Sequence, residues 1–371
     1  MSTYISGNGS QSWVKEETSF GSGMPAAGDA TLLNMTSESM SATYNLLEEE
    51  TLIGAKTQPD QDLGSITASG SVSTILNPSM SDWVFKTALG KVQDILNPAD
   101  PDTPEGAYTD DYDSHFDGQV FTLADVDEDI PSSAMKLIRG TQRFEYNGLT
   151  IRTLTLNCTA QDYVTCDIDF AGLDEVTVDK PYSDSWLSDR PDAPTHGSYK
   201  CTQARLFATT ANSDTIADFP FSWGACSADV LHKVWDVENT VLTLDNGIED
   251  TPATYCSGLY ANRPVKGQRT LTVQCNVPYS ESFADFRKTY YANENAEKLA
   301  LLLAFCSKEK TDWGSGPVPS EQVFVIIPNV RFTNAGANVG GQGLIDASFE
   351  GRAVSVGSTE PVKVIVRHSL V

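Results

Sequence analysis

The same series of structural elements occurs twice along the chain, in the same order. A segment of alternating polar and apolar residues begins the first series near Glu38 and the second series near Glu238. In each series a second alternating segment, a short helix-like segment and a closing pair of strand-like segments follow. Self-similarity of this kind indicates repeated structural units. We therefore predict two tandem modules, residues 31–172 and 230–371.

Each module is predicted to be mostly β. Strict alternation over residues 65–75, and again over 268–276, is typical of strands with one buried and one polar face. The closing segments of the first module, 149–157 and 163–170, are rich in β-branched residues and predict a hairpin. We expect an α+β fold in which each module is an antiparallel β-sandwich with one short helix.

The helix of the first module is predicted to start at Asn77 and Pro78, which suit the N-cap and the first helical position. Apolar side chains at helical spacing would bury one face of each helix. These side chains are Met80, Trp83, Val84 and Ala88 in the first module and Phe283, Phe286 and Tyr290 in the second.

Charge is unevenly distributed over the 371 residues, whose formal net charge is −25. Residues 1–130 hold 22 acidic and 4 basic side chains. This excess of acidic side chains argues against a protein that binds nucleic-acid phosphates, because such binding needs Lys and Arg. We assign residues 1–30 to an N-terminal arm that orders on assembly, about 98–130 to a solvated acidic insertion, and 173–229 to a connecting arm.

No cofactor or metal site is predicted. The seven cysteines are odd in number and none shares C-x-x-C spacing, which favours reduced thiols, and the four histidines are dispersed. Residues 113–124 share part of a calcium-loop pattern, but His115 and Ala124 stand where oxygen ligands belong, so we favour a solvated acidic loop.

Enzymes and membrane proteins are also disfavoured. The sequence contains no nucleophile elbow, phosphate loop, zinc-protease or dinucleotide-binding motif, so we predict that the protein is not an enzyme. It has no apolar run long enough to span a membrane and no signal-peptide pattern, so we expect no membrane insertion and synthesis in a cytoplasm.

At the repeated elements the sequence resembles the tail tube proteins of long-tailed, siphovirus-like bacteriophages, of the two-module type. The segments before the two helices carry the likeness: TSESMSATYNLLEEETLIGAKTQPDQDLGSITASGSVSTIL and VLTLDNGIEDTPATYCSGLYANRPVKGQRTLTVQC. The strands that end in DFAG and in NVRFTNAGANVGGQGLIDASFEG belong to the same pattern. The likeness covers roughly residues 30–172 and 230–370, and the acidic stretch 100–129 and the arm 174–225 are longer than the usual pattern.

The resemblance implies a structural virion protein that forms the stacked rings of a phage tail tube, through which genomic DNA passes during ejection. It implies a ring of six modules around a large β-barrel. Since the chain holds two modules, three chains would complete a pseudo-hexameric homotrimer. Six modules of four strands give about two dozen strands, enough to leave an aqueous lumen. Rings would stack head-to-tail in the virion tail after assembly in the host cytoplasm.

The polar strand faces are predicted to form the wall of the lumen, because small hydroxyl and amide groups bind water but carry no positive charge that would bind phosphates. The alternative is that these faces form the outside of the tube. The residues predicted to face the lumen are Ser39, Ser41, Thr43, Asn45, Ser65, Thr67, Ser69, Ser71, Ser73, Asn239, Thr243, Asp245, Gln268, Thr270, Thr272 and Gln274.

The loops that join these strands are predicted to contact neighbouring subunits or rings, as long loops of the family do; mobile surface loops are the alternative. Their candidate residues are Glu48, Glu49, Glu50, Lys56, Asp60, Asp62, Glu249, Asp250, Arg263 and Lys266. By resemblance, a tape-measure protein, a tail terminator and distal tail proteins are expected partners, with double-stranded DNA in transit. Two other functions fit the composition: another virion or cell-surface β-sandwich protein (minor tail, decoration or adhesin), and the tube of a contractile injection system.

Overall fold

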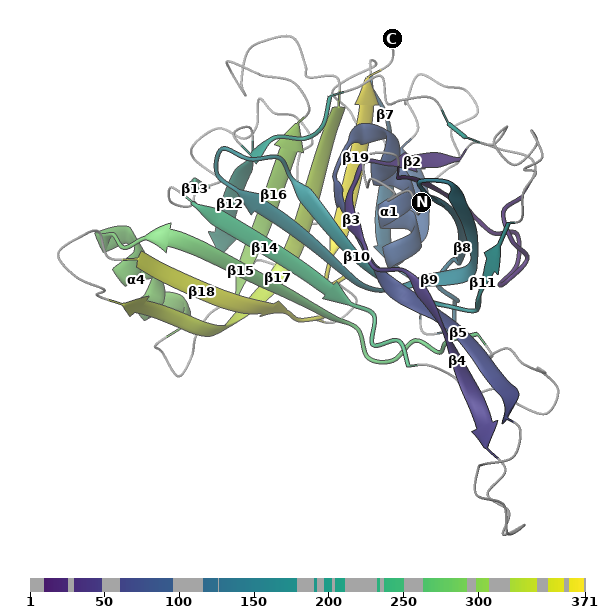
Figure 1. Cartoon of the computed structure of the whole chain (residues 1–371). Helices are drawn as coiled ribbons and strands as arrows, with labels where there is room; N and C mark the ends of the chain where they lie inside the picture. The colour runs from purple at the N-terminus through teal and green to yellow at the C-terminus, as the bar shows by residue number, and fades with distance from the viewer. Residues whose placement is uncertain are drawn as a thin grey trace, which may run out of the picture.

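A computed structural model of the chain gives the fold (Figure 1). The residues that it describes are 10–25, 30–48, 61–95, 116–125, 127–178, 190–191, 197–201, 204–210, 232–233, 237–249, 263–291, 298–306, 321–338, 346–356 and 360–369. Within these ranges the chain is mostly β, as predicted, and its strands are hydrogen-bonded into one antiparallel network.

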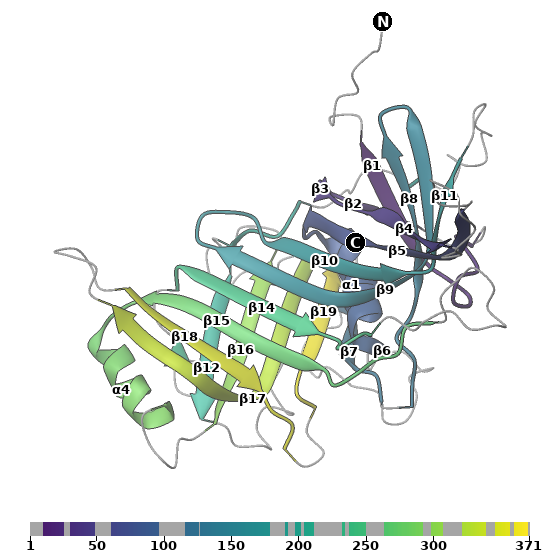
Figure 2. The same cartoon turned by 60° about the horizontal axis from the view of Figure 1, so that its bottom comes forward.

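Eight strands form a continuous sheet that crosses both halves of the sequence (Figure 2), here called the eight-strand sheet. Their spatial order is β4–β5–β10–β9–β14–β15–β18–β17. The short strand β3 (Met35–Glu38) precedes β4 and also pairs with β5. The bounds of the eight strands are β4 Ser41–Glu48, β5 Gln61–Ile75, β10 Thr165–Gly172, β9 Gln142–Thr159, β14 Asn239–Asp245, β15 Thr270–Pro278, β18 Asp346–Ala353 and β17 Glu321–Asn338.

Two of these strands are long enough to enter a second layer that runs across the first (Figure 2). The first part of β9 pairs with β8 and β11, and the first part of β17 pairs with β16 and β19. The remaining strands extend these two groups. The bounds are β1 Gln11–Glu16, β2 Thr31–Leu33, β6 Gly90–Ile95, β7 Phe116–Leu123, β8 Ser133–Arg139, β11 Asp174–Thr177, β12 Arg205–Thr210, β13 His232–Lys233, β16 Leu299–Cys306 and β19 Lys363–Ser369.

One helix follows the second strand of each series. In α1 (Pro78–Leu89) the Asn77 side chain accepts a hydrogen bond from the Met80 backbone N–H at 3.2 Å, so the predicted N-cap is confirmed. The predicted apolar face of α1 is buried. In α4 (Glu281–Tyr290) the cap is Ser280, and Phe283 is fully buried. The side chains of Phe286 and Tyr290 lie outside the described residues.

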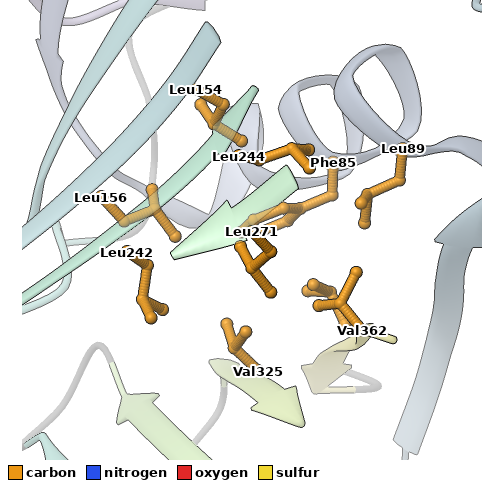
Figure 3. Close-up of a pocket in the computed structure, with 10 residues that line it drawn as sticks. Phe85, Leu89, Leu154, Leu156, Leu242, Leu244, Leu271, Val325 and Val362 are labelled. Carbon is orange, nitrogen blue, oxygen red and sulfur yellow. The ribbon is translucent and has the colours of Figure 1, made fainter. Parts of the chain in front are cut away.

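The two halves of the chain share one hydrophobic core. Residues of α1 and β9 pack in the same buried cluster as residues of β14, β15, β17 and β19. The Phe85 ring of α1 lies 6.2 Å from the Phe121 ring of β7, centroid to centroid. Between the halves is a small apolar cavity (Figure 3), lined by Phe85, Leu89, Leu154, Leu156, Leu242, Leu244, Leu271, Val325, Val362 and Val364. The predicted module boundaries are therefore not boundaries between separate cores.

Three segments predicted as arms or loops contribute strands. Within residues 1–30, β1 pairs with β2 and β8 and buries Trp13, so this part is ordered within a single chain. Within the acidic insertion, β7 pairs with β6 and β19 and buries Val120. Within residues 173–229, β11 and β12 join the second layer and Tyr199 is buried. These strands are short apolar runs among acidic or Gly- and Ser-rich residues, and each of β1, β7 and β12 has one partner that lies far away in sequence: β8, β19 and β16.

The weaker structural alternatives can be placed as well. Asp117 and Gly118, part of the possible calcium loop, lie in strand β7 opposite His368 and Arg367. Asp113 and His115 lie outside the described residues. The described cysteines are buried and form no disulfide, in agreement with reduced thiols; these are Cys158, Cys166, Cys201, Cys275 and Cys306.

Candidate functional site

The two faces of the eight-strand sheet differ sharply in polarity. Side chains that stand directly opposite one another on neighbouring strands lie on the same face. One such row crosses five strands, from β5 to β15, and is polar throughout: Ser73, Asp167, Thr155, Thr243 and Thr272. The next row is Ser71, Asp169, Thr153, Asp245 and Thr270. We call this side of the eight-strand sheet the polar face.

Hydrogen bonds between side chains connect the strands across the polar face. The Thr155 and Thr243 hydroxyl oxygens lie 3.4 Å apart across the junction between β9 and β14. The Asn157 amide donates to Asp167 Oδ2 at 2.8 Å. The Asn45 amide donates to the Ser65 hydroxyl at 2.8 Å. Small polar groups thus satisfy one another in part while remaining accessible to water.

The opposite face of the same sheet is apolar and packs into the core. Val72, Ile168, Leu154, Leu242 and Val273 alternate with the polar residues and are buried. Because α1 and the second layer cover this face, the polar face is the one that the fold leaves open to solvent.

The residues predicted to face the lumen are brought together by this arrangement. Those in β4, β5, β14 and β15 lie on the polar face in the registers given above. Ser39 lies between β3 and β4, and its hydroxyl is 3.0 Å from that of Ser71, on the same face. Gln268 is exposed just before β15. The role of these residues as a lumen wall stays a prediction.

Several polar-face residues were missed by sequence reasoning, charged ones in particular. Asp167 and Asp169 lie on β10, and Glu350 lies on β18 opposite Gln274. Arg352 of β18 stands opposite both Thr272 and Arg331 of β17. The alternation in TCDIDF and in DASFEGRA carried this signal, but the sequence alone did not show which strands share a face.

The described charges on the polar face are nearly balanced. Besides the residues above, Asp245 is exposed on β14, and Arg152 approaches Asp169 with an N···O distance of 3.7 Å. The closing hairpin of the first half contributes the two aspartates of β10 to this face. The aspartates lie over the first half and the middle of the sheet, whereas Glu350 and the Arg331–Arg352 pair lie near the β17 edge.

An ion pair holds the end of β3, just before the edge strand β4 of the eight-strand sheet. Arg139 of β8 donates to both carboxylate oxygens of Glu38, at 2.7 and 2.6 Å, and also to the Met40 carbonyl oxygen at 2.5 Å. Tyr146 donates to the same carbonyl at 3.2 Å. Burial alone would raise the pKa of Glu38, but the hydrogen bonds and charge of Arg139 outweigh it and lower that pKa below its ordinary value.

The predicted contact loops are only partly described. Asp62 and Glu249 are exposed, and Glu48 ends β4. Arg263 donates to Asp129 Oδ2 at 2.8 Å, and Lys266 donates to the backbone carbonyl oxygens of Asp125 and Glu128. Both side chains are therefore bound by acidic residues of the first half of the same chain. Glu49, Glu50, Lys56, Asp60 and Asp250 lie outside the described residues.

Comparison with protein families decides the assignment. The sequence profile of the family described as phage tail tube protein matches residues 7–353, nearly the whole chain. The chain belongs to the phage tail tube protein family. This confirms the predicted tail tube family and makes the protein a structural component of the virion tail that assembles into the tube. The siphovirus-like type and the two-module organisation stay predictions. A comparison with curated protein sequences found no match.

Two further findings concern the described part of this tail tube protein. Within it, no group of three or more histidine, cysteine, aspartate or glutamate side chains is arranged to hold a metal ion. None of its described helices is long and apolar enough to cross a membrane.

Proposed function

We propose that three copies of this chain form a pseudo-hexameric ring, that the rings stack head-to-tail into the tail tube, and that the polar face lines the channel for DNA. Eight strands from each chain would give a barrel of about two dozen strands, wide enough for an aqueous lumen. The observation that carries the proposal is the unbroken eight-strand sheet, with one polar and one core face across both halves.

The order of strands in the two halves supports the pseudo-sixfold arrangement. In the first half the order in space is β4–β5–β10–β9, and in the second it is β14–β15–β18–β17. In chain order both series read first, second, fourth, third. We infer that the halves descend from a duplicated module, of the kind found in siphovirus-like tails.

The chemistry of the polar face suits passage of DNA without specific binding. Hydroxyl and amide groups hold water, and the acidic groups repel phosphates and nearly balance the described arginines of this face. The protein would need no catalysis for this role. Its other partners would be a tape-measure protein, a tail terminator and distal tail proteins, met during assembly in the host cytoplasm.

The first test is electron microscopy of the purified chain, combined with mass measurement of its smallest ring. We expect rings or hollow rods with a central hole and three chains per ring. Rings of six chains would contradict the pseudo-hexameric arrangement, and solid particles without a hole would contradict a tube wall built from the eight-strand sheet.

A further inference from the structure

The eight-strand sheet contains one junction between its two halves, at β9 and β14. Thr153 stands opposite Asp245 and Thr155 opposite Thr243 in an antiparallel register. The junction continues on the core face, where Leu154 stands opposite Leu244. One chain therefore contains a complete example of how two adjacent four-strand units join.

Both ends of the eight-strand sheet are open edges. Within the described residues, β4 pairs only with β5, and the last part of β17, from Arg331 to Asn338, pairs only with β18. Open edges of this length are templates for pairing with another chain. A second copy of the same chain offers the complementary edge.

The two β-bulges allow the halves to be aligned residue by residue. In β9 the pairing with β10 skips Arg152, and in β17 the pairing with β18 skips Thr333. Aligning these bulges makes Asn334 equivalent to Thr153 and Gly336 equivalent to Thr155. The pairing is then followed strand by strand across each half. Phe170 of β10 is equivalent to Gly351 of β18, and their partners Gly70 and Val273 are equivalent in turn. One residue earlier, Ser69 and Thr272 pair with Ser41 and Thr243, so Ser41 is equivalent to Thr243 and Thr43 to Asp245.

We propose that β17 of one chain pairs antiparallel with β4 of the next chain, in the register of the internal junction. Asn334 then stands opposite Thr43, and Gly336 stands opposite Ser41. The faces agree in this register, because Asn334 and Thr43 are on the polar face, whereas buried Ala335 meets Ala42 on the core side. This inference rests on the proposed ring and specifies its contact between chains.

Exposed apolar side chains support the same contact. Tyr44 and Leu46 alternate with polar-face residues along β4 and therefore lie on its apolar side, yet they are 52% and 54% exposed. Their equivalents in the second half are Asn246 and Ile248, which are buried.

The first half of the chain is what covers those two equivalents. Asn246 donates to the Ala88 and Ile151 carbonyl oxygens at 3.1 and 2.8 Å, and Ile248 packs with Ile130 and Ala171. In Figure 1 the β4–β5 hairpin instead extends away from the body of the molecule. The neighbouring chain would provide the missing cover.

Engineered cysteine pairs test the register. With Asn334→Cys and Thr43→Cys in one chain, oxidation of assembled rings should link neighbouring chains into covalent products that end at three chains. Thr153→Cys with Asp245→Cys is the matched control, because it joins the equivalent positions of the internal junction within one chain and should give no product between chains. The unsubstituted protein shows the background from native thiols.

Shifted pairs make the test specific to one register. Asn334→Cys with Ser41→Cys, or with Asn45→Cys, places the cysteines on diagonal neighbours. Diagonal positions lie about 7–8 Å apart, too far for a disulfide, which needs a Cα separation of about 4.4–6.8 Å. These variants should therefore link poorly.

Each outcome separates the inference from the proposed function. Rings that link through Asn334 and Thr43, but not through the shifted pairs, support both. Rings that link only through a shifted pair, or through none, overturn the register while the tube proposal stands. Failure to form rings overturns the proposed function and the contact together.

Discussion

At the scale of single residues, the Arg139–Glu38 pair fixes the start of β4. Glu38 lies where β3 ends, and its partner comes from β8 in the other layer. Arg139 also holds the Met40 carbonyl, which follows the break between β3 and β4. Arg139 thus binds the chain on both sides of the break that precedes β4.

Loss of this pair should destabilise the chain in a pH-dependent way. Hydrogen bonds to charged groups contribute about 1.5–3 kcal/mol, so we expect Glu38→Gln to lower the free energy of unfolding by about 2 kcal/mol at neutral pH. The folded state lowers the pKa of Glu38 below its ordinary value of 4.5, so the pair stabilises the protein fully above that value. The stabilisation is lost as pH falls through the lowered pKa.

Denaturant unfolding of both proteins across the acid range measures this effect. The difference between the natural protein and Glu38→Gln should shrink toward zero at low pH. A difference that stays constant with pH would show that the carboxylate charge contributes nothing.

At the scale of elements, the strands were predictable where alternation is strict and both partners are close in sequence. The hairpin of β9 and β10, the alternation in β5 and β15, and the Asn77 cap of α1 all follow from local chemistry. Strand β7 was missed because it follows a strongly acidic stretch, and one of its two partners, β19, lies at the far end of the chain. The exposure of Tyr44 was also missed, because alternation shows which face a residue is on but not whether anything covers that face.

The break between β3 and β4 depends on a glycine in the neighbouring strand. Gly70 has φ of +147°, and a Cβ there would lie 2.6 Å from the Ser39 carbonyl oxygen. Gly70→Ala should lower the free energy of unfolding by about 1–3 kcal/mol, because both backbones would have to move. Denaturant unfolding measures the change.

Gly336→Ala is the matched control for that substitution. A Cβ at Gly336 meets only the Asn334 side-chain oxygen at 3.8 Å, an ordinary contact. Equal losses in the two variants would contradict the special role of Gly70.

At the scale of the whole molecule, the eight-strand sheet could be predicted in its parts but not in its continuity. The sequence indicates four strands for each half, and their polar faces, because both are local patterns. The junction of β9 with β14, and the sharing of one core by both halves, depend on contacts between distant segments. The charged residues of the polar face became apparent only from the register.

Added positive charge on the polar face should slow DNA passage. We expect Ser69→Lys with Ser71→Lys to leave tube assembly intact and to reduce the rate of genome ejection, because each new ammonium group can bind a phosphate. The measurement is ejection from particles that carry the variant, at low and high salt, with the delay smaller at high salt. Gln93→Lys on β6, exposed in the second layer, is the control, and an unchanged ejection rate in the double variant would contradict the lumen assignment.

The Arg331–Arg352 pair has no counterpart in the first half, where Arg152 and Asp169 occupy the region of the equivalent bulge. In the proposed ring, the electrostatic potential of the channel would therefore have threefold rather than sixfold symmetry. A ring of identical single modules must repeat every substitution six times, whereas a ring of fused unlike halves repeats it three times. In a ring of fused halves, one substitution thus changes the charge of the channel by three units instead of six.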